Sequence, residues 1–447
     1  MRERNSSMGI KVAKFGGSSV ADGIQLTKTK EIIEHDPDRR YIVVSAPGKR
    51  YDGDNKITDL LYLCKTHMDH NLAYDQIFQV VIDRYMAVKL NLGIDIDLSV
   101  YFDEIRENLK KNPSADYVAS RGEYLNAILV AAFLGYDFVD TADLVKFDAR
   151  GKIMMDETDR RLREALQQHE RAVLPGFYGS NLDGKIKTFS RGGSDITGAL
   201  VARAINADVY ENWTDVSGFL VADPRIVKNP KKITTISYKE LRELSYMGAS
   251  VLHEDAIYPA RMANVPINIR NTNDPKDPGT LITAESHDPG DGSIITGIAG
   301  NKDFTVVALY KNMMSSERGF VRRILGILDD YDINFEHLPS SIDTVSVVMS
   351  NKALGDRLDE VLDAFRQRLQ PDSIDVFENM ALIATVGRRM SYRPGVSARL
   401  FNALGEAEVN IRMIEQGSSE MNIIVGVENK DFEKAIKAIY SAFIEEE

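Results

Sequence analysis

The start of the chain joins a short apolar segment, a glycine pair, a helical segment and a second apolar segment. This order is the strongest constraint on its fold. Residues 10–15 predict a strand that Gly16 and Gly17 end, and residues 41–46 predict the next strand. A strand–helix–strand order favours a parallel sheet, because the connecting helix must return over one face of the sheet. Further short strands are predicted at 138–141, 172–177, 207–212 and 266–269. We therefore expect an α/β domain with a parallel-type central sheet sandwiched by helices.

A change in composition at 286–301 predicts a domain boundary, since this segment is rich in Gly, Asp and Ser and lacks helical periodicity. Beyond it the sequence repeats itself. Residues 306–309 resemble 382–385, the apolar residues of 321–328 match those of 396–404, and 345–348 match 422–425. Each copy predicts a strand, an amphipathic helix and two further strands. Two related βαββ units are therefore expected, with chance similarity as the alternative.

Composition limits the classes of function. A chain of 447 residues exceeds one hydrophobic core. The formal net charge of −12 argues against nucleic acid or an anionic membrane as a partner. The one cysteine, Cys64, cannot form an internal disulfide and fits a reducing compartment such as the cytoplasm. The apolar stretch at 127–134 is too short to span a bilayer and predicts a buried helix.

The first glycine pair is a candidate anion site. Glycines let backbone N–H groups approach an anion, and a following helix N-terminus adds partial positive charge. Lys14 adds a full charge at the end of the strand. The alternative is a plain turn with a solvated lysine.

A second glycine pair lies in the segment SRGGSDIT at 190–197, which also leads into a helix. Arg191 offers a fork for a carboxylate or phosphate. Asp195 falls in the first helical turn, where helix capping is the alternative role. Together the two pairs suggest facing sites for a phosphoryl donor and an anionic acceptor.

Two further segments could carry chemistry. Glu123 is expected at the start of a buried helix, where it could pair with an ammonium group or be an ordinary first-turn acid. Trp213 opens a loop at the carboxyl end of a predicted parallel strand, where open α/β sheets bind ligands. As the only tryptophan, it is more often a core residue than a platform for a base. No Gly-x-Gly-x-x-Gly follows a strand, and no His and Cys cluster predicts a metal site.

In this order and spacing the segments resemble the aspartate kinases of the amino-acid kinase family. The matching segments are KFGGSSV (14–20), Thr58, SRGE (120–123), RGGSD (191–195), WTDVSG (213–218), DPR (223–225) and GASVLH (248–253). The two C-terminal units resemble paired ACT domains, and 410–427 is similar to the second of them. The resemblance implies a catalytic domain over 9–295, a first ACT domain over 301–378 and a second over 379–433. In one arrangement 434–447 completes the first ACT domain, with a strand near 436–443.

The resemblance also implies a role for each matched residue. Lys14 would contact the transferring phosphoryl group, and Asp195 would orient the site. Aspartate would be held by Thr58, Glu123 and Arg191, through its ammonium at Glu123 and a carboxylate at Arg191. Nucleotide contacts would come from Lys14, Phe15, Gly16, Gly17, Ser18, Thr214, Asp215, Leu220, Arg225 and Ser250. An effector pocket would involve Met314, Gly319, Val321, Asn334 and Glu336, whose alternative is ordinary ACT core and loop.

The implied reaction moves the γ-phosphoryl group of ATP, bound with Mg²⁺, to the side-chain carboxylate of L-aspartate. This would be the first step toward lysine, threonine and methionine. A carboxyl group with an ordinary pKa of about 3.9 is already ionised, so no general base is needed. The site must instead offset charge repulsion and align the reactants. No dedicated protein cage for the metal is expected.

Two positions depart from the family pattern, since Ser250 replaces a frequent lysine and Leu220 replaces a tyrosine of some relatives. The resemblance further implies a monofunctional homodimer or homotetramer inhibited by an amino acid, with lysine favoured over threonine. Two alternatives stay open. One is an amino-acid kinase for another small acid, such as glutamate or a carbamate, and the other is a catalytically silent amino-acid sensor.

Overall fold

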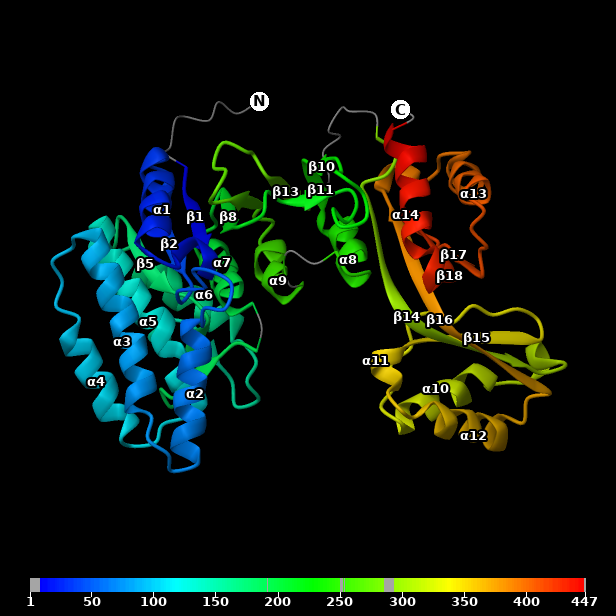
Figure 1. The fold of residues 1–447 in the computed structure, drawn as a ribbon, viewed down its shortest axis with the longest axis horizontal. Helices are drawn as coiled ribbons and strands as arrows, with labels where there is room; N and C mark the ends of the chain where they lie inside the picture. Colours follow the sequence, from blue (N-terminus) through cyan, green and yellow to red (C-terminus); the bar gives the residue numbers. More distant parts are fainter. Residues whose placement is uncertain (1–8, 191, 250–251, 253, 285–292, 446–447) are drawn as a thin grey trace. The chain divides into compact units, whose positions relative to one another are not determined.

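The structure is a computed structural model that describes residues 9–190, 192–249, 252, 254–284 and 293–445. Its contacts divide the chain into two units (Figure 1). Unit 1 comprises Met1–Phe219, Lys232–Lys239 and Val251–Pro289, and unit 2 comprises Leu220–Lys231, Glu240–Ser250 and Gly290–Glu447. Within the expected catalytic range of 9–295, the segments 220–231, 240–250 and 290–295 thus belong to unit 2 by their contacts.

An eight-stranded sheet forms the centre of unit 1. Its order is β11 (Thr235–Ser237), β13 (Thr280–Thr283), β12 (Ile267–Asn271), β8 (Val209–Thr214), β1 (Lys11–Phe15), β2 (Arg39–Val44), β5 (Ala172–Pro175) and β3 (Asp137–Phe138). Every neighbouring pair is parallel except β12 with β13. The expected parallel-type sheet is therefore confirmed.

Helices cover both faces of this sheet (Figure 1). The helix α7 (Gly193–Ala204) packs on β1, β2 and β8, and itself contacts α6 (Met155–Leu166) and α9 (Glu254–Met262). The other face supports a large apolar core with α1 (Gly23–His35), α2 (Ile57–Asp69), α3 (Asp75–Leu92), α4 (Ser99–Leu109) and α5 (Ala115–Leu134).

Strand alternation decides which side chains meet which helices. On β1 and β8, Phe15 lies opposite Trp213, and Lys14 lies opposite Asn212. Phe15 and Trp213 belong to the large apolar core, with rings stacked at 5.9 Å. Because successive side chains point to opposite faces, Lys14 and Asn212 lie on the α7 side. Trp213 is 1% exposed, so the core interpretation of this residue is confirmed.

The helix that carries Glu123 begins earlier than expected. The Ser114 hydroxyl caps α5 by accepting a hydrogen bond from the Tyr117 N–H at 3.2 Å, so the helix starts at Ala115. Inside this helix, position 122 favours glycine, because a Cβ there would lie 2.9 Å from the Ala46 Cβ. Glu123 is therefore an interior helix residue, and the prediction that it stands in the first turn is wrong.

A smaller three-stranded sheet joins β4 (Lys146–Phe147), β6 (Tyr178–Asn181) and β7 (Ile186–Thr188). The antiparallel β6–β7 pair turns through residues 182–185, where Leu182, Asp183 and Gly184 predict a hairpin. This sheet precedes α7 along the chain.

Unit 2 contains a five-stranded sheet in the order β15–β14–β16–β18–β17. Its strands are β14 (Gly297–Tyr310), β15 (Thr344–Ser350), β16 (Ser373–Val386), β17 (Met413–Glu415) and β18 (Asn422–Glu428). The first repeat is β14, α10 (Phe320–Asp330) and β15, and the second is β16, α13 (Val396–Glu406), β17 and β18. The repeat is confirmed, although residues 333–340 of the first copy form only isolated bridges, His337 with Val348 and Ser340 with Val345.

Residues near the end of the chain form a helix, so the strand expected near 436–443 is wrong. The helix α14 (Phe432–Tyr440) buries Phe432, Ala435, Ile436 and Ile439. Residues at this spacing lie on one face of a helix, whereas in a strand they would lie on two opposite faces. The helix packs on α13, β14 and β16.

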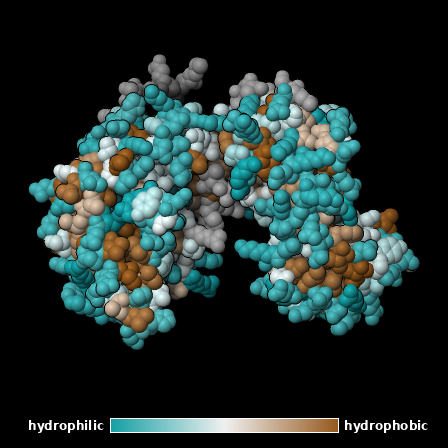
Figure 2. Space-filling model, in the orientation of Figure 1, coloured by the Kyte–Doolittle hydropathy of each residue, from teal (hydrophilic) through white to brown (hydrophobic). Residues whose placement is uncertain are grey.

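The described residues include no helix long and apolar enough to cross a bilayer. Figure 2 shows a mainly hydrophilic surface with separate hydrophobic patches, one of them where α10 and α12 (Leu358–Leu369) lie in Figure 1.

The packing of α7 on β8 gives a testable stability prediction. A Cβ on Gly198 would lie 2.6 Å from the Tyr210 ring, so Gly198→Ala should destabilise unit 1 by about 1–3 kcal/mol. Gly326→Ala is the matched control in α10, because no atom lies within 4 Å of its Cβ position. It should stabilise the protein by about 0.5–1 kcal/mol. Urea denaturation measures both, and equal effects would contradict the packing argument.

Candidate active site

Functional side chains gather where parallel strands of unit 1 end. The strands β1, β2, β5 and β8 run parallel, so their carboxyl ends meet at one edge of the sheet. This is the edge at which open α/β sheets bind ligands.

Lys14 and Asp195 form the centre of the site. The Lys14 Nζ lies 2.6 Å from Asp195 Oδ1, and the Lys14 side chain is only 8% exposed. Asn212 donates from Nδ2 to the same Asp195 oxygen at 2.8 Å, and its Oδ1 lies 3.5 Å from Lys14 Nζ. Asp195 does stand in the first turn of α7, but no side chain caps that helix. Its carboxylate pairs with Lys14 instead, so the capping alternative is wrong.

The first glycine turn is held by backbone contacts. The Gly16 N–H donates to the Trp213 carbonyl at 3.0 Å, and the Gly48 N–H donates to the Gly17 carbonyl at 2.9 Å. Gly16 therefore cannot offer its N–H to a phosphate, which leaves Gly17 and Ser18 as the candidates in this turn. A Cβ on Gly17 would lie 3.1 Å from the Ala46 carbonyl, so the close approach of the two loops favours glycine.

The helix after this turn differs from the expectation. Only a short 3-10 turn, Gly17–Val20, follows β1 directly. The long helix α1 starts at Gly23, and the Asp22 carboxylate already accepts from the Gln25 N–H at 2.9 Å. Because an acid caps α1, that helix end cannot supply the positive partial charge expected for a phosphate.

Glu123 is a buried acid without a full set of partners. It is 5% exposed, and its Oε2 has no hydrogen-bond partner. Burial raises the pKa of Glu123 to about 8, although a hydrogen bond from the backbone of Ala46 opposes the shift. Ala46 follows the end of β2, so Glu123 lies at the same edge as Lys14. An orphaned carboxylate oxygen here suits a cationic group of a ligand.

Sequence reasoning missed the unusual backbone conformation of Phe177, which follows β5 at this edge. Its φ of 78° is in the left-handed region, which costs a residue other than glycine roughly 1–3 kcal/mol. The Phe177 N–H donates to Thr197 Oγ1 at 3.1 Å, and a Cβ on Gly193 would lie 2.6 Å from its ring. These contacts with α7 fix the conformation, and only the glycines on either side hint at it in the sequence.

The remaining predicted residues lie in several places. Thr58 is half-buried in the first turn of α2, and Thr214 ends β8 with its hydroxyl 3.2 Å from the Asp215 carboxylate. Leu220 and Arg225 belong to unit 2, where the exposed Arg225 guanidinium pairs with Asp223 at 2.6 Å. Arg191 and Ser250 lie outside the described residues.

The predicted effector residues lie in unit 2. Met314 is buried in the apolar core of the first repeat, and Gly319 precedes α10 with a φ of 76°. Val321 and Asn334 are exposed, whereas Glu336 accepts a hydrogen bond from the Tyr246 hydroxyl. Burial together with this carboxylate raises the pKa of Tyr246 to about 12.

No dedicated metal cage is found in the part of the chain that the structure describes, since no group of three or more His, Cys, Asp or Glu side chains gathers there. Asp195 Oδ1 is already engaged by Lys14 and Asn212.

The environment of Glu123 predicts how stability depends on pH. The folded carboxyl keeps its proton up to pH about 8, whereas the unfolded one loses it near the ordinary value of 4.5. Stability should therefore fall as pH rises between these values, and level off above them. Glu123→Gln removes this loss, so its advantage over the unchanged protein should grow by up to about 1.4 kcal/mol per pH unit.

Urea denaturation followed by the fluorescence of Trp213, the only tryptophan, measures this in unit 1. Glu164→Gln is the control, because that carboxylate is exposed. A stability difference that does not change with pH would contradict a buried, protonated Glu123.

Comparisons with known proteins identify the family of the chain. The amino acid kinase family matches residues 9–271, and the ACT domain matches residues 383–443. Aspartokinase 3 of Bacillus subtilis (strain 168) is 38% identical over 97% of this chain and 98% of its own length.

Solved structures give the same result. The structure of Clostridium acetobutylicum aspartate kinase is 50% identical, with a TM-score of 0.90 over 97% of this chain and 100% of that chain. Escherichia coli aspartokinase III was solved with aspartate and ADP, and with lysine and aspartate. Both structures are 26% identical, with a TM-score of 0.72 over 97% of this chain and 99% of theirs. The chain therefore belongs to the amino acid kinase family and, within it, to the aspartate kinases that carry ACT domains.

Proposed function

We propose that this protein transfers the γ-phosphoryl group of ATP to the side-chain carboxylate of L-aspartate, forming 4-phospho-L-aspartate. The observation that carries the proposal is the pairing of Lys14 with Asp195 beside a glycine turn, at the edge where Glu123 keeps an unpartnered carboxylate oxygen. Lys14 suits a phosphate group, and Glu123 suits an ammonium group. The E. coli relative solved with aspartate and ADP supports the same pair of substrates.

The chemistry needs charge compensation more than proton transfer. The aspartate carboxylate is ionised at neutral pH and can attack phosphorus directly. Lys14 is held in a nearly dry position, where its charge acts more strongly on a transferring phosphoryl group than it would in water. Asp195 and Asn212 fix the position of the Lys14 ammonium group. Asp195 therefore acts as an orienting group.

Mg²⁺ would arrive as part of the nucleotide. When bound, it would neutralise part of the charge of the phosphate groups. The protein contributes Lys14 and the N–H groups of Gly17 and Ser18, which are the parts of the turn not used by Trp213.

Glu123 would recognise the α-ammonium of the substrate. A nearby cation favours the ionised carboxylate, so aspartate binding would take the proton from Glu123 near neutral pH. Thr58 and Arg191 would complete the aspartate contacts, and Thr214, Asp215, Leu220, Arg225 and Ser250 those of the nucleotide.

A regulatory role is proposed for unit 2. Its two repeats belong to a chain that is related to E. coli aspartokinase III, which was solved with lysine and aspartate. Lysine is therefore the first effector to test, with threonine as the alternative. The first repeat exposes Val321, Phe335 and Ile342, with Ile342 70% exposed. These apolar side chains suit contact with a second copy in a homodimer or homotetramer. We place the reaction in the cytoplasm, at the start of aspartate-derived amino-acid synthesis.

Acyl-phosphate formation trapped as a hydroxamate tests the function. With ATP and Mg²⁺ we expect product from L-aspartate and none from L-glutamate or N-acetyl-L-glutamate. Lys14→Met should lower kcat by about 10³-fold or more, because it removes a positive charge that is shielded from water beside the phosphoryl group. Lys110→Met is the matched control, since the Lys110 side chain is 65% exposed.

Other results of this assay would contradict the proposal in different ways. Turnover of L-glutamate alone would indicate a kinase for another small acid. No turnover from a folded, nucleotide-binding protein would indicate a silent sensor. Full activity in Lys14→Met would contradict the role of this residue.

Calorimetry tests the regulatory proposal. Lysine should bind more weakly when L-aspartate and MgADP are present, by a factor corresponding to about 1–3 kcal/mol, because coupling between sites is reciprocal. Asn334→Ala should weaken lysine binding and leave kcat without effector unchanged. Identical lysine affinity with and without substrates would exclude inhibition through substrate binding. Threonine measured in parallel identifies the preferred effector.

A further inference from the structure

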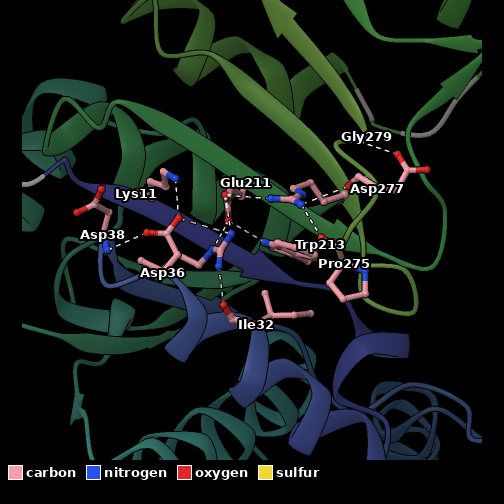
Figure 3. Close-up of polar contacts among 11 residues, drawn as sticks. Lys11, Ile32, Asp36, Asp38, Glu211, Trp213, Pro275, Asp277 and Gly279 are labelled. Carbon is pink, nitrogen blue, oxygen red and sulfur yellow. Dashed lines mark hydrogen bonds and ion pairs between the residues drawn. The ribbon is translucent and has the colours of Figure 1, made fainter.

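A buried group of charges lies on the face of β8 opposite to Lys14 (Figure 3). At its centre is Glu211, whose side chain is 3% exposed. Glu211 accepts hydrogen bonds from Arg39 Nε at 2.7 Å and Nη2 at 3.1 Å. It also accepts from Trp213 Nε1 at 2.9 Å and faces Arg270 Nη1 at 3.8 Å.

The two arginines are anchored to other parts of unit 1. Arg39 donates from Nη1 to the Ile32 carbonyl of α1 at 2.5 Å. Arg270 donates from Nη2 to the Pro275 carbonyl at 2.7 Å, in the loop after β12. Both guanidinium groups also lie over the Trp213 ring, at 5.3 Å and 4.5 Å from its centroid. Glu211 thus ties the indole to α1 and to the loop after β12 (Figure 3).

Trp213 connects this group of charges to the candidate active site. Its carbonyl accepts the Gly16 N–H at 3.0 Å, and its ring stacks on Phe15. The residue before it, Asn212, contacts Lys14 and Asp195 on the other face. Any shift of β8 at Trp213 would therefore move both the glycine turn and the partner of Lys14.

Stability alone does not account for these charges. Taking ions out of water costs several kcal/mol each, and replacing a buried ion pair by apolar side chains of similar volume is often neutral or stabilising. The surrounding face of the sheet is apolar and includes Phe15 and Ala13. A rigid, directional set of hydrogen bonds fixes one position of the indole more sharply than apolar packing does.

We infer that Glu211 is a positioning residue for phosphoryl transfer, which acts by fixing Trp213 and thereby the Gly16 turn and Lys14. The inference rests on the proposed kinase activity. In the reaction it supplies no contact to substrate, and its effect is the alignment of the groups that make those contacts.

Kinetics of three variants test the inference in the full-length chain. Glu211→Leu removes every acceptor, Glu211→Gln keeps one amide oxygen, and Trp213→Phe removes the indole N–H together with part of the buried ring. Because displacement by about 1 Å can cost about 10²-fold in rate, Glu211→Leu should lower kcat by about 10–100-fold. The KM for L-aspartate should change less than about twofold, and Glu211→Gln should lie between Glu211→Leu and the unchanged protein.

A matched control separates positioning from stability. Asp159→Asn breaks the partly buried Arg203–Asp159 pair of 2.8 Å on α6 and α7. Its melting temperature should fall while kcat stays unchanged. If Glu211→Leu shows the same result, a lower melting temperature with unchanged kcat, its role is structural and the inference is wrong.

Fluorescence gives a readout that does not need turnover. Trp213 is the only tryptophan, so its emission reports on this part of the molecule. MgADP should change the emission of the unchanged protein, and this change should be lost or reduced in Glu211→Leu. An equal change in both proteins would contradict the coupling between Glu211 and the turn. If the unchanged protein makes no acyl phosphate, the proposed function fails, whereas the fluorescence comparison still decides whether Glu211 is coupled to the glycine turn.

Discussion

The parallel pairing of β1 with β8 is the constraint on which the rest of unit 1 depends. Its register sets Lys14 opposite Asn212 and Phe15 opposite Trp213. Because side chains alternate, one face receives the ion pair with Asp195 and the other receives the stacked rings and Glu211. A slip of one residue would exchange the two faces and remove the site.

Three buried ionisable residues of unit 1 differ in their partners. Lys14, Glu123 and Glu211 are each at most 7% exposed, and each serves a different purpose. Lys14 is paired within the protein, Glu123 keeps one unpartnered oxygen, and Glu211 is saturated with donors. A free buried acceptor favours a ligand, whereas a saturated one favours rigidity. The difference in partners therefore separates a group suited to binding from one suited to positioning.

In unit 2 the two repeats share their longest strands. The strands β14 and β16 are long enough to pair with each other in both repeats, from Gly297 with Val386 to Tyr310 with Ser373. The helices α10 and α12 pack together in the first repeat, and α13 and α14 in the second. Because the same two strands run through both repeats, the repeats form one continuous sheet.

The sequence by itself determined the parallel strands β1, β2 and β8, the two glycine turns, the repeat and the choice of Lys14 and Asp195 as candidate residues. These features depend on local periodicity and on residue types with strong backbone preferences. Only the tertiary structure decided the use of the Gly16 N–H by Trp213, the conformation of Phe177, the interior position of Glu123 and the bonds that surround Glu211. Apart from the start of α5, which the nearby Ser114 sets, each of these depends on a partner far away in the chain, such as Arg39 for Glu211. A pattern of neighbouring residues carries no information about which distant groups will share a buried site.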